Sequence, residues 1–360
     1  MTLAQLGAEV IRVDPVGGAP DTTRWPLAPN GGSLYWAGLN KGKRSVTFDF
    51  RSAEGQRAVA DLVAESGADG GILLTNASYP WLSYEALKAG RPDLIHLRIT
   101  GRHDGSPAVD YTVNAGIGFP LTTGDEQWQG PVNHVLPAWD VACGLYAAVG
   151  LLAAERHRRR TGEGRAITLS LADVALAVTG HLGFLAEAHL TGRSRPRIGN
   201  HLYGGFARDF RTSDDGCVLV VTLTKRHFAD LARVTGRAEA LAAVEQALGA
   251  DFAADSGRYE HREVIAALLA PWFAERTAGE VADALEDTSV LWERYRTFAE
   301  LATDPDTLAS PLVGLIDQPG IGRILATGTP LEMQGTSAGP APAPVLGADT
   351  EAVLSELAGQ

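Results

Sequence analysis

The chain has 360 residues, 45% of them hydrophobic, and only two cysteines, Cys143 and Cys217. Lys and Arg number 31 against 43 Asp and Glu, so the net charge of −12 argues against nucleic acid or an anionic membrane as a partner. Each cysteine lies in an apolar run without a CxxC pattern, which indicates buried thiols rather than metal ligands or disulfides. The sequence shows no signal peptide and no uncharged apolar stretch of membrane-spanning length, so we expect a cytoplasmic protein.

The first part of the chain alternates strand and helix patterns. Val46, Phe48 and Phe50 are separated by polar residues, which is the period of a half-buried strand. Repetition of this order predicts the α/β class, with a large lobe built on an open, mostly parallel sheet and covering helices. The expected segments are a helix and strand over 3–13, a turn at 14–18, a strand at 45–50, a helix at 56–65, a strand at 71–74, a helix at 84–89 and a strand at 94–99.

The second part begins with one long helix over residues 141–160, apolar on most of its circumference and basic in its last turn. Thr161, Gly162, Glu163 and Gly164 are expected to end it. The later segments expected are a strand at 166–171, a helix at 173–190, a glycine-rich loop at 199–209, a strand at 217–224, helices within 226–270 and at 278–285, a stiff linker at 338–344 and a helix at 349–357.

A single core for a chain of this length would be unusually large, so we expect two lobes. The predicted division has a large lobe over residues 1–190 and a smaller α/β lobe with linkers over 191–330. A C-terminal linker and helix over 331–360 are expected to return to the large lobe.

Asp140 directly precedes the long predicted helix and is a natural N-cap residue. On this pattern alone, a purely structural cap is the more frequent explanation. The same position also suits a nucleophile, because a helix N-terminus stabilises a carboxylate in its ionised form. Capping and catalysis are not exclusive.

Lys41, Lys43 and Arg44 concentrate positive charge just before a predicted strand, and Arg51 follows that strand. Most such clusters are solvated loops. In an acidic protein, however, a compact basic loop beside a βα unit is also a candidate seat for nucleotide phosphates.

Gly204 and Gly205 lie in a loop where backbone N–H groups can approach a ligand closely, as oxyanion stabilisation requires, although an ordinary turn is equally compatible. The histidines show no HExxH or triad-like spacing. The sequence contains no GxGxxG, P-loop or GxSxG motif, which argues against dinucleotide binding, ATP cleavage and α/β-hydrolase chemistry.

Three segments together resemble the class III (CaiB/BaiF-type) CoA-transferases: LAQLGAEVIRVDPVGG, LNKGKRSVTFDFRSAEGQ and PAWDVACGLYAAVGLLAAERHRRRTGEG. The resemblance runs through nearly the whole chain, to PVLGADTEAVLSEL near its end. It implies transfer of coenzyme A through an aspartyl thioester, with Asp140 as the catalytic aspartate, in a large CoA-binding lobe. It also implies an interlocked homodimer, a CoA thioester of a small dicarboxylic acid as substrate, and no metal or other cofactor.

The resemblance carries further roles onto this sequence. It places CoA contacts at Phe48 and Arg51, at Asn76 after the next strand, and at Arg12 near the adenosine part. The residues that the resemblance places in the thioester pocket are Val109, Asp110 and Tyr111.

Two features depart from the family pattern. Related racemases have a histidine where this chain has Val109, so a two-base proton exchange lacks one partner and racemisation is not expected. Relatives also carry a strand and a glycine-containing loop ahead of the segment that begins here at Met1, so part of the CoA pocket is expected to be missing.

The resulting hypothesis is transfer of CoA between the two carboxyl groups of one small dicarboxylic acid. Two alternatives stay open. One is transfer between separate dicarboxylic acids, and the other is a catalytically silent CoA-binding subunit.

Overall fold

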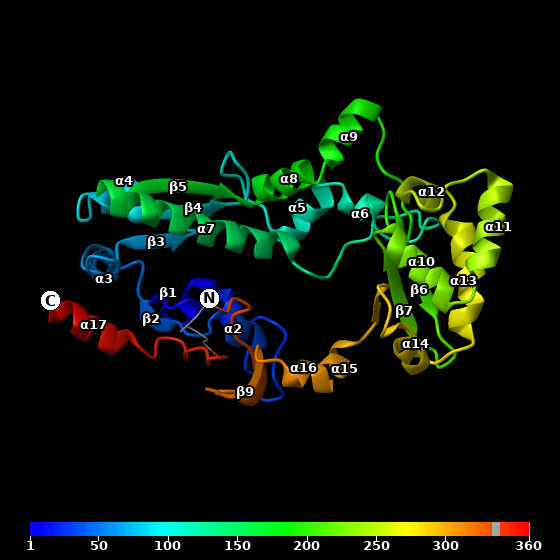
Figure 1. Cartoon of the computed structure of the whole chain (residues 1–360). Coiled ribbons are helices and arrows are strands. Elements are labelled where there is room, and N and C mark those ends of the chain that lie inside the picture. Colours follow the sequence, from blue (N-terminus) through cyan, green and yellow to red (C-terminus); the bar gives the residue numbers. More distant parts are fainter. Residues whose placement is uncertain (333–338, 360) are drawn as a thin grey trace. The chain divides into compact units, whose positions relative to one another are not determined.

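The computed structural model describes residues 1–332 and 339–359, which form two compact units (Figure 1). The first unit holds Met1–Gly116, Leu136–Leu182 and the described residues from Leu301 onward. The second holds Ile117–Val135 and Gly183–Glu300. Parallel strands with covering helices confirm the predicted α/β class.

The first unit contains two parallel sheets, one of β1 and β2 and one in the order β3-β4-β5, together with an antiparallel hairpin of β9 and β10. The predicted parallel strands are therefore divided over two sheets. The hairpin was not predicted. The elements are α1 (Thr2–Gln5), β1 (Ile11–Pro15), η1 (Pro20–Thr23), α2 (Leu34–Leu39), β2 (Arg44–Phe48), α3 (Ala53–Ala64), β3 (Ile72–Thr75), η2 (Pro80–Leu82), α4 (Tyr84–Lys88), β4 (Ile95–Thr100), α5 (Asp110–Gly116), α7 (Ala138–Thr161), β5 (Arg165–Ser170), α8 (Leu171–His181), α16 (Pro305–Ala309), β9 (Val313–Gln318), β10 (Gly322–Thr327) and α17 (Thr350–Ala358), with α15 (Phe298–Leu301) at the unit boundary.

Helix α3 shows why the local sequence folds as it does. The Ser52 hydroxyl accepts the N–H of Gly55 at 2.9 Å, which caps the helix. A Cβ at Gly55 would lie 2.2 Å from the carbonyl oxygen of Asp49, so only glycine allows this tight return from β2. The apolar face of α3 packs in one core with residues of β2 and with Leu94, which directly precedes β4.

Helix α7 runs alongside β4 (Figure 1). Its buried residues Ala147, Leu151 and Ala154 pack against Ile95 and Leu97 of the strand. The helix ends at Thr161, and its C-cap Gly162 has φ 75°, which confirms the predicted stop. Its first residue is Ala138, three residues earlier than expected.

The C-terminal segment returns to the first parallel sheet, where Figure 1 shows α17 beside β2. The Asp349 carboxylate accepts the N–H of Ser45 at 2.8 Å, and the Thr350 hydroxyl accepts the N–H of Thr47 at 3.1 Å. These bonds satisfy the outer edge of β2. Ala338, at the start of the predicted linker, lies outside the described residues.

The second unit is built on an antiparallel sheet in the order β6-β7-β8, with a core that β6, β7 and helices α10, α11, α13 and α14 share. Strand β6 was expected to be loop, but its Phe206 and Phe210 point into this core. The predicted helix over 173–190 breaks at Gly183, which has φ 82°. The elements are α6 (Phe119–Thr122), α9 (Phe184–Thr191), β6 (Phe206–Arg211), β7 (Cys217–Thr222), α10 (Lys225–Val234), α11 (Ala238–Leu248), α12 (Asp255–Glu260), α13 (Arg262–Ala274), α14 (Ala278–Leu285) and β8 (Leu291–Arg294).

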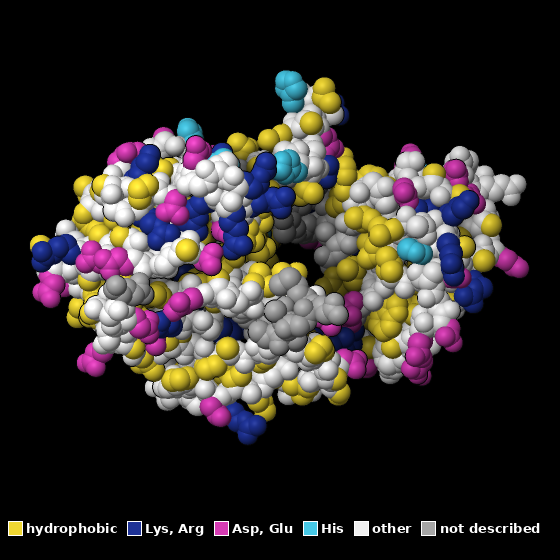
Figure 2. Space-filling view, turned by 60° about the vertical axis from the view of Figure 1, so that its left-hand side comes forward, with side chains coloured by type: hydrophobic (Ala, Val, Ile, Leu, Met, Phe, Trp, Pro, Cys, Tyr) yellow, Lys and Arg dark blue, Asp and Glu magenta, His cyan; other side chains and the backbone are white. Residues whose placement is uncertain are grey.

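Acidic and basic side chains are interspersed over the face shown in Figure 2, with apolar side chains between them. By length and composition alone, one helix of the described chain, α7, is long and apolar enough to cross a membrane. Only 28% of its apolar window is buried inside the chain.

Near its C-terminal end, α7 is fixed by Arg158. This side chain is 6% exposed, donates from Nη1 to the Gly70 carbonyl at 2.6 Å and lies 3.6 Å from an Asp93 carboxylate oxygen. Arg158 therefore connects α7 to the turn before β3 and to the turn before β4. Removal of its guanidinium group would leave buried carbonyl groups in these turns without a hydrogen-bond donor.

We expect Arg158→Ala to lower the free energy of unfolding by about 3 kcal/mol, because it removes buried charge-assisted hydrogen bonds and one side of an ion pair. Urea denaturation followed by circular dichroism measures the loss. The matched control is Arg160→Ala, which removes an exposed arginine from the same turn. Equal losses in the two variants would contradict the assigned role of Arg158.

Candidate active site at the start of helix α7

Asp140 is the third residue of α7, and Pro137 is the N-cap. The expectation that Asp140 itself caps the helix is therefore wrong. The helix starts earlier because Ala138 already has helical geometry, and the N–H of Val141 donates to the Pro137 carbonyl at 3.1 Å. Proline has no side-chain acceptor, so the N–H groups of the first turn need an acceptor from elsewhere.

Asp110, the first residue of α5, supplies that acceptor. Its Oδ2 accepts the N–H of Trp139 at 2.8 Å and the N–H of Asp140 at 3.1 Å. One turn further along α5, the Asn114 Oδ1 accepts the indole N–H of Trp139 at 3.2 Å. Asp110 and Asn114 are each 2% exposed, so this contact between α5 and α7 is shielded from water.

The Asp140 side chain is accessible, and the described residues offer its carboxylate no hydrogen-bond partner. Partial burial of its surroundings raises its pKa above the ordinary value of 3.8, the nearby Asp110 charge raises it further, and Arg24 acts in the opposite direction. We expected the helix N-terminus to favour the ionised form. The pKa is raised instead, because burial and the neighbouring Asp110 charge both disfavour the Asp140 anion.

Cys143 follows Asp140 by one turn but does not compete with it as a nucleophile. The thiol is buried, and burial together with the Asp140 charge raises its pKa to about 11. A thiol with this pKa holds very little of the reactive thiolate near neutral pH.

The three residues predicted to line the thioester pocket do not share one face of the chain. Val109 is 57% exposed and Tyr111 54% exposed, whereas Asp110 between them is buried. Val109 and Tyr111 are therefore available to a ligand, and Asp110 faces the start of α7.

The predicted phosphate-binding cations are largely engaged inside the first unit. Arg12 pairs with Asp14 and Asp21 and also donates to Asn40. The other three cations are also committed: Lys41 Nζ donates to the Thr327 carbonyl at 2.8 Å, Lys43 Nζ to the Asn40 amide oxygen at 2.8 Å, and Arg44 pairs with Glu9 and Glu356. These contacts hold chain segments together.

Two of the predicted CoA-contacting residues, Arg51 and Asn76, have exposed side chains. Arg51 follows β2 and Asn76 follows β3, and both lie on the surface. Phe50 directly precedes Arg51, Tyr79 follows Asn76 by three residues, and the centroids of these two rings are 6.2 Å apart. Phe48, in contrast, is buried in the core with its side chain unavailable to a ligand.

Gly204 and Gly205 belong to the second unit, in the loop before β6. Gly204 has φ 77°, a conformation that glycine adopts without strain. The N–H of Gly205 donates to the Leu202 carbonyl at 3.2 Å, so it is already engaged in a turn.

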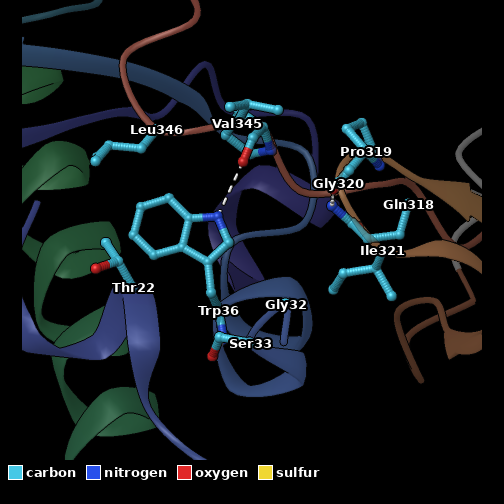
Figure 3. A pocket seen from close by; sticks show the side chains of 11 residues that line it. Thr22, Gly32, Ser33, Trp36, Gln318, Pro319, Gly320, Ile321, Val345 and Leu346 are labelled. Carbon is cyan, nitrogen blue, oxygen red and sulfur yellow. Dashed lines mark hydrogen bonds between the residues drawn. The ribbon is translucent and has the colours of Figure 1, made fainter. Parts of the chain in front are cut away.

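A small cavity of about 170 Å³ lies in the first unit between Trp36, the β9–β10 turn and the segment Pro344–Leu346 (Figure 3). The indole N–H of Trp36 donates to the Pro344 carbonyl at 2.9 Å. The lining is uncharged and includes none of the predicted site residues, so we assign the cavity no catalytic role. Within residues 1–332 and 339–359, no group of three or more His, Cys, Asp or Glu side chains is arranged to hold a metal ion.

The candidate site is therefore the start of α7 in an α/β unit. Buried Asp110 caps the helix, and accessible Asp140 in its first turn is the candidate nucleophile. The model of CoA-transferase family III matches residues 1–350, and the chain belongs to this family. Its predicted membership is thereby confirmed.

The chain is 47% identical to 2-methylfumaryl-CoA isomerase from Chloroflexus aurantiacus, over 100% of this chain and 89% of that protein. It is 28% identical to succinyl-CoA–D-citramalate CoA-transferase from the same organism, over 99% of this chain and 89% of the relative. A crystal structure of a CaiB/BaiF family protein from Brucella suis superposes with a TM-score of 0.79 at 27% identity, covering 99% of this chain and 93% of that one.

Sequence reasoning missed the contact between Asn114 and Trp139 at the start of α7, and it missed Arg24 as a charge that acts on Asp140. Asp110 and Asn114 are spaced four residues apart, so on a helix they share one face, and Trp139 directly precedes the candidate nucleophile. That spacing was a usable signal for this contact. Arg24 lies over a hundred residues away in the sequence, and only the fold brings its charge near.

Proposed function

We propose that the protein moves coenzyme A within one molecule, converting mesaconyl-C1-CoA (2-methylfumaryl-CoA) to mesaconyl-C4-CoA (3-methylfumaryl-CoA). The 47% identity to 2-methylfumaryl-CoA isomerase across the whole chain carries the proposal. The accessible and unbonded carboxylate of Asp140 supports it. The corresponding pathway is the 3-hydroxypropionate cycle of carbon fixation, in the cytoplasm.

In the first half-reaction, a carboxylate oxygen of Asp140 attacks the C1 thioester carbon and CoA leaves as the thiolate, giving a mixed anhydride. The thiolate then attacks the aspartyl carbonyl carbon, forms the aspartyl-CoA thioester and releases the C1 carboxylate. The C4 carboxylate next attacks the aspartyl thioester carbon, expels the CoA thiolate and forms a second mixed anhydride. The thiolate then attacks the C4 acyl carbon, which releases the Asp140 carboxylate and the C4 thioester product. Every bond broken is matched by one formed, so the reaction needs no metal, redox cofactor or nucleotide.

The remaining predicted site residues receive supporting roles in this proposal. Arg51 contributes positive charge and Asn76 hydrogen bonds to CoA, whereas Arg12 and Phe48 act through the scaffold. Val109 and Tyr111 line the acyl site. The Gly204 N–H stabilises the tetrahedral oxyanions, whereas the Gly205 N–H donates to the Leu202 carbonyl and holds the loop.

Mesaconyl-C1-CoA offered without any free acid distinguishes intramolecular from intermolecular transfer. We expect the C4 thioester to accumulate, and added isotopically labelled mesaconate to enter the product poorly, because the acid stays in the pocket. Strict dependence on a free acceptor acid would contradict isomerisation and favour an intermolecular transferase. Failure to turn over any thioester while still binding CoA would favour the silent CoA-binding subunit.

Replacing Asp140 by Ala should lower turnover roughly 10⁴-fold or more, because it removes the atom that carries the acyl group and CoA. Intact-mass spectrometry of the native protein with substrate should show a covalent CoA adduct that the variant lacks. Asp69→Ala is the control, since Asp69 is a strongly exposed aspartate of the same unit. Full activity of Asp140→Ala would remove Asp140 from the mechanism.

We also propose that a second copy of this chain covers the exposed stripe of α7. Val141, Leu145, Val149 and Leu152 follow one another at helical spacing and are 52%, 51%, 64% and 53% exposed. A stripe of this kind on a helix that packs against β4 through other residues is typical of a subunit interface. A homodimer would remove it from water.

We expect Val149→Asp to shift the protein from dimer to monomer in analytical ultracentrifugation, because the change places a charge in the apolar stripe. Val16→Asp is the control, since Val16 is 71% exposed in a turn away from α7. A monomeric parent protein at micromolar concentration would refute the homodimer. Recovery of the protein in the membrane fraction would assign the apolar stripe to a lipid surface instead.

A further inference from the structure

We propose that Asp110 is the positioning residue for Asp140: it closes the first turn of α7 from a neighbouring helix and thereby leaves the Asp140 carboxylate unbonded and accessible. The inference rests on the proposed role of Asp140 as nucleophile. It changes the role of Asp110 from a pocket-lining residue to a group that acts through Asp140.

The N–H groups at the start of α7 show how much depends on Asp110. The N–H of Ala138 donates to the Leu136 carbonyl at 2.8 Å, and that of Val141 to the Pro137 carbonyl at 3.1 Å. The two N–H groups between them, those of Trp139 and Asp140, both donate to Asp110 Oδ2. A single buried oxygen therefore satisfies the part of the turn that contains the nucleophile.

Pro137 explains why Asp140 stays unbonded. In a capping box, the side chain at the third helical position accepts the backbone N–H of the N-cap residue. Proline has no N–H, so this bond cannot form. Asp110 already accepts the N–H groups of Trp139 and Asp140, so these two donors are also unavailable to the Asp140 side chain. The lone pairs of the Asp140 carboxylate therefore remain available for attack on a carbonyl carbon.

The neighbouring Asn114 reinforces this geometry from the same face of α5. Asp110 binds the backbone of Trp139, and Asn114 binds the indole of that residue. Residue 139 is thus held by main chain and side chain together, which limits movement of Asp140 directly after it. Small displacements of a nucleophile from its attack geometry reduce rates strongly.

The charges that face Asp140 give this arrangement an electrostatic consequence. Asp110 on α5 repels the Asp140 anion, Arg24 from the loop after η1 attracts it, and Cys143 on α7 is uncharged near neutral pH. Burial and the Asp110 charge raise the pKa of Asp140. The carboxylate is ionised and nucleophilic above this pKa, and it becomes protonated and unreactive as the pH falls through it. Removal of the Asp110 charge must lower this pKa.

The decisive variant is Asp110→Asn, which keeps the shape and one acceptor oxygen but removes the charge. We expect the acid limb of the kcat/KM profile to move to lower pH, and kcat on the plateau to fall at least about tenfold because the cap is weaker. A role confined to folding would change stability without moving the acid limb. An acid limb at the position of the parent protein overturns the proposal.

Asp304→Asn is the matched control. Asp304 caps α16 by accepting the N–H of Thr307 at 3.0 Å, so the change removes the same charge from another helix start. We expect this variant to keep both the acid limb and kcat. If Asp110→Asn does not fold, Asp110→Ser, with an uncharged acceptor in a smaller side chain, must show the same shift of the acid limb.

The outcome for Asp140 separates the two proposals. If Asp140→Ala is inactive and Asp110→Asn retains the parent pH profile and rate, only the positioning role of Asp110 fails. If Asp140→Ala remains active, the nucleophile itself is misassigned.

Discussion

The hydrogen bonds from the first turn of α7 to the buried carboxylate of Asp110 are the constraint on which the candidate site depends. A helix that begins after proline lacks a side-chain cap, and its exposed N–H groups would otherwise be satisfied by water or by Asp140 itself. With Asp110 in place, the helix start is rigid and Asp140 is excluded from capping. One structural requirement therefore produces both the stability of the turn and an available carboxylate.

The rest of the first unit fixes α7 along its length. Its middle packs on β4 through small and branched apolar side chains, and Arg158 ties its far end to the turns that precede β3 and β4. Helix α5 contacts the start of α7, and β4 and the turns before β3 and β4 contact the rest of it. The position of Asp140 is therefore determined by several elements. A nucleophile on a rigid helix terminus loses little orientational freedom when it reacts.

The sequence predicted elements best where local signals were strong. Glycine at 162 ends α7 as expected, and Ser52 with the alternation of Val46 and Phe48 located α3 and β2. Strand β6 was missed because its glycine-rich approach resembles a loop, and its burial depends on helices far along the chain. For the site, Asp140 was identified but its capping role was assigned wrongly, since the true acceptor comes from another helix. Local pattern cannot reveal an acceptor thirty residues away.

The same limitation explains the basic loop. Charge density around residue 43 indicated a phosphate seat, yet Lys41, Lys43 and Arg44 donate to β10, to Asn40 and to acidic side chains near both ends of the chain. These three cations are committed to folding, whereas Arg51 after β2 is exposed. A cation that is already paired within the chain attracts a distant anion only weakly, because its partner's charge offsets its own. Charge density along the sequence therefore overstates the attraction that this loop offers to a phosphate group.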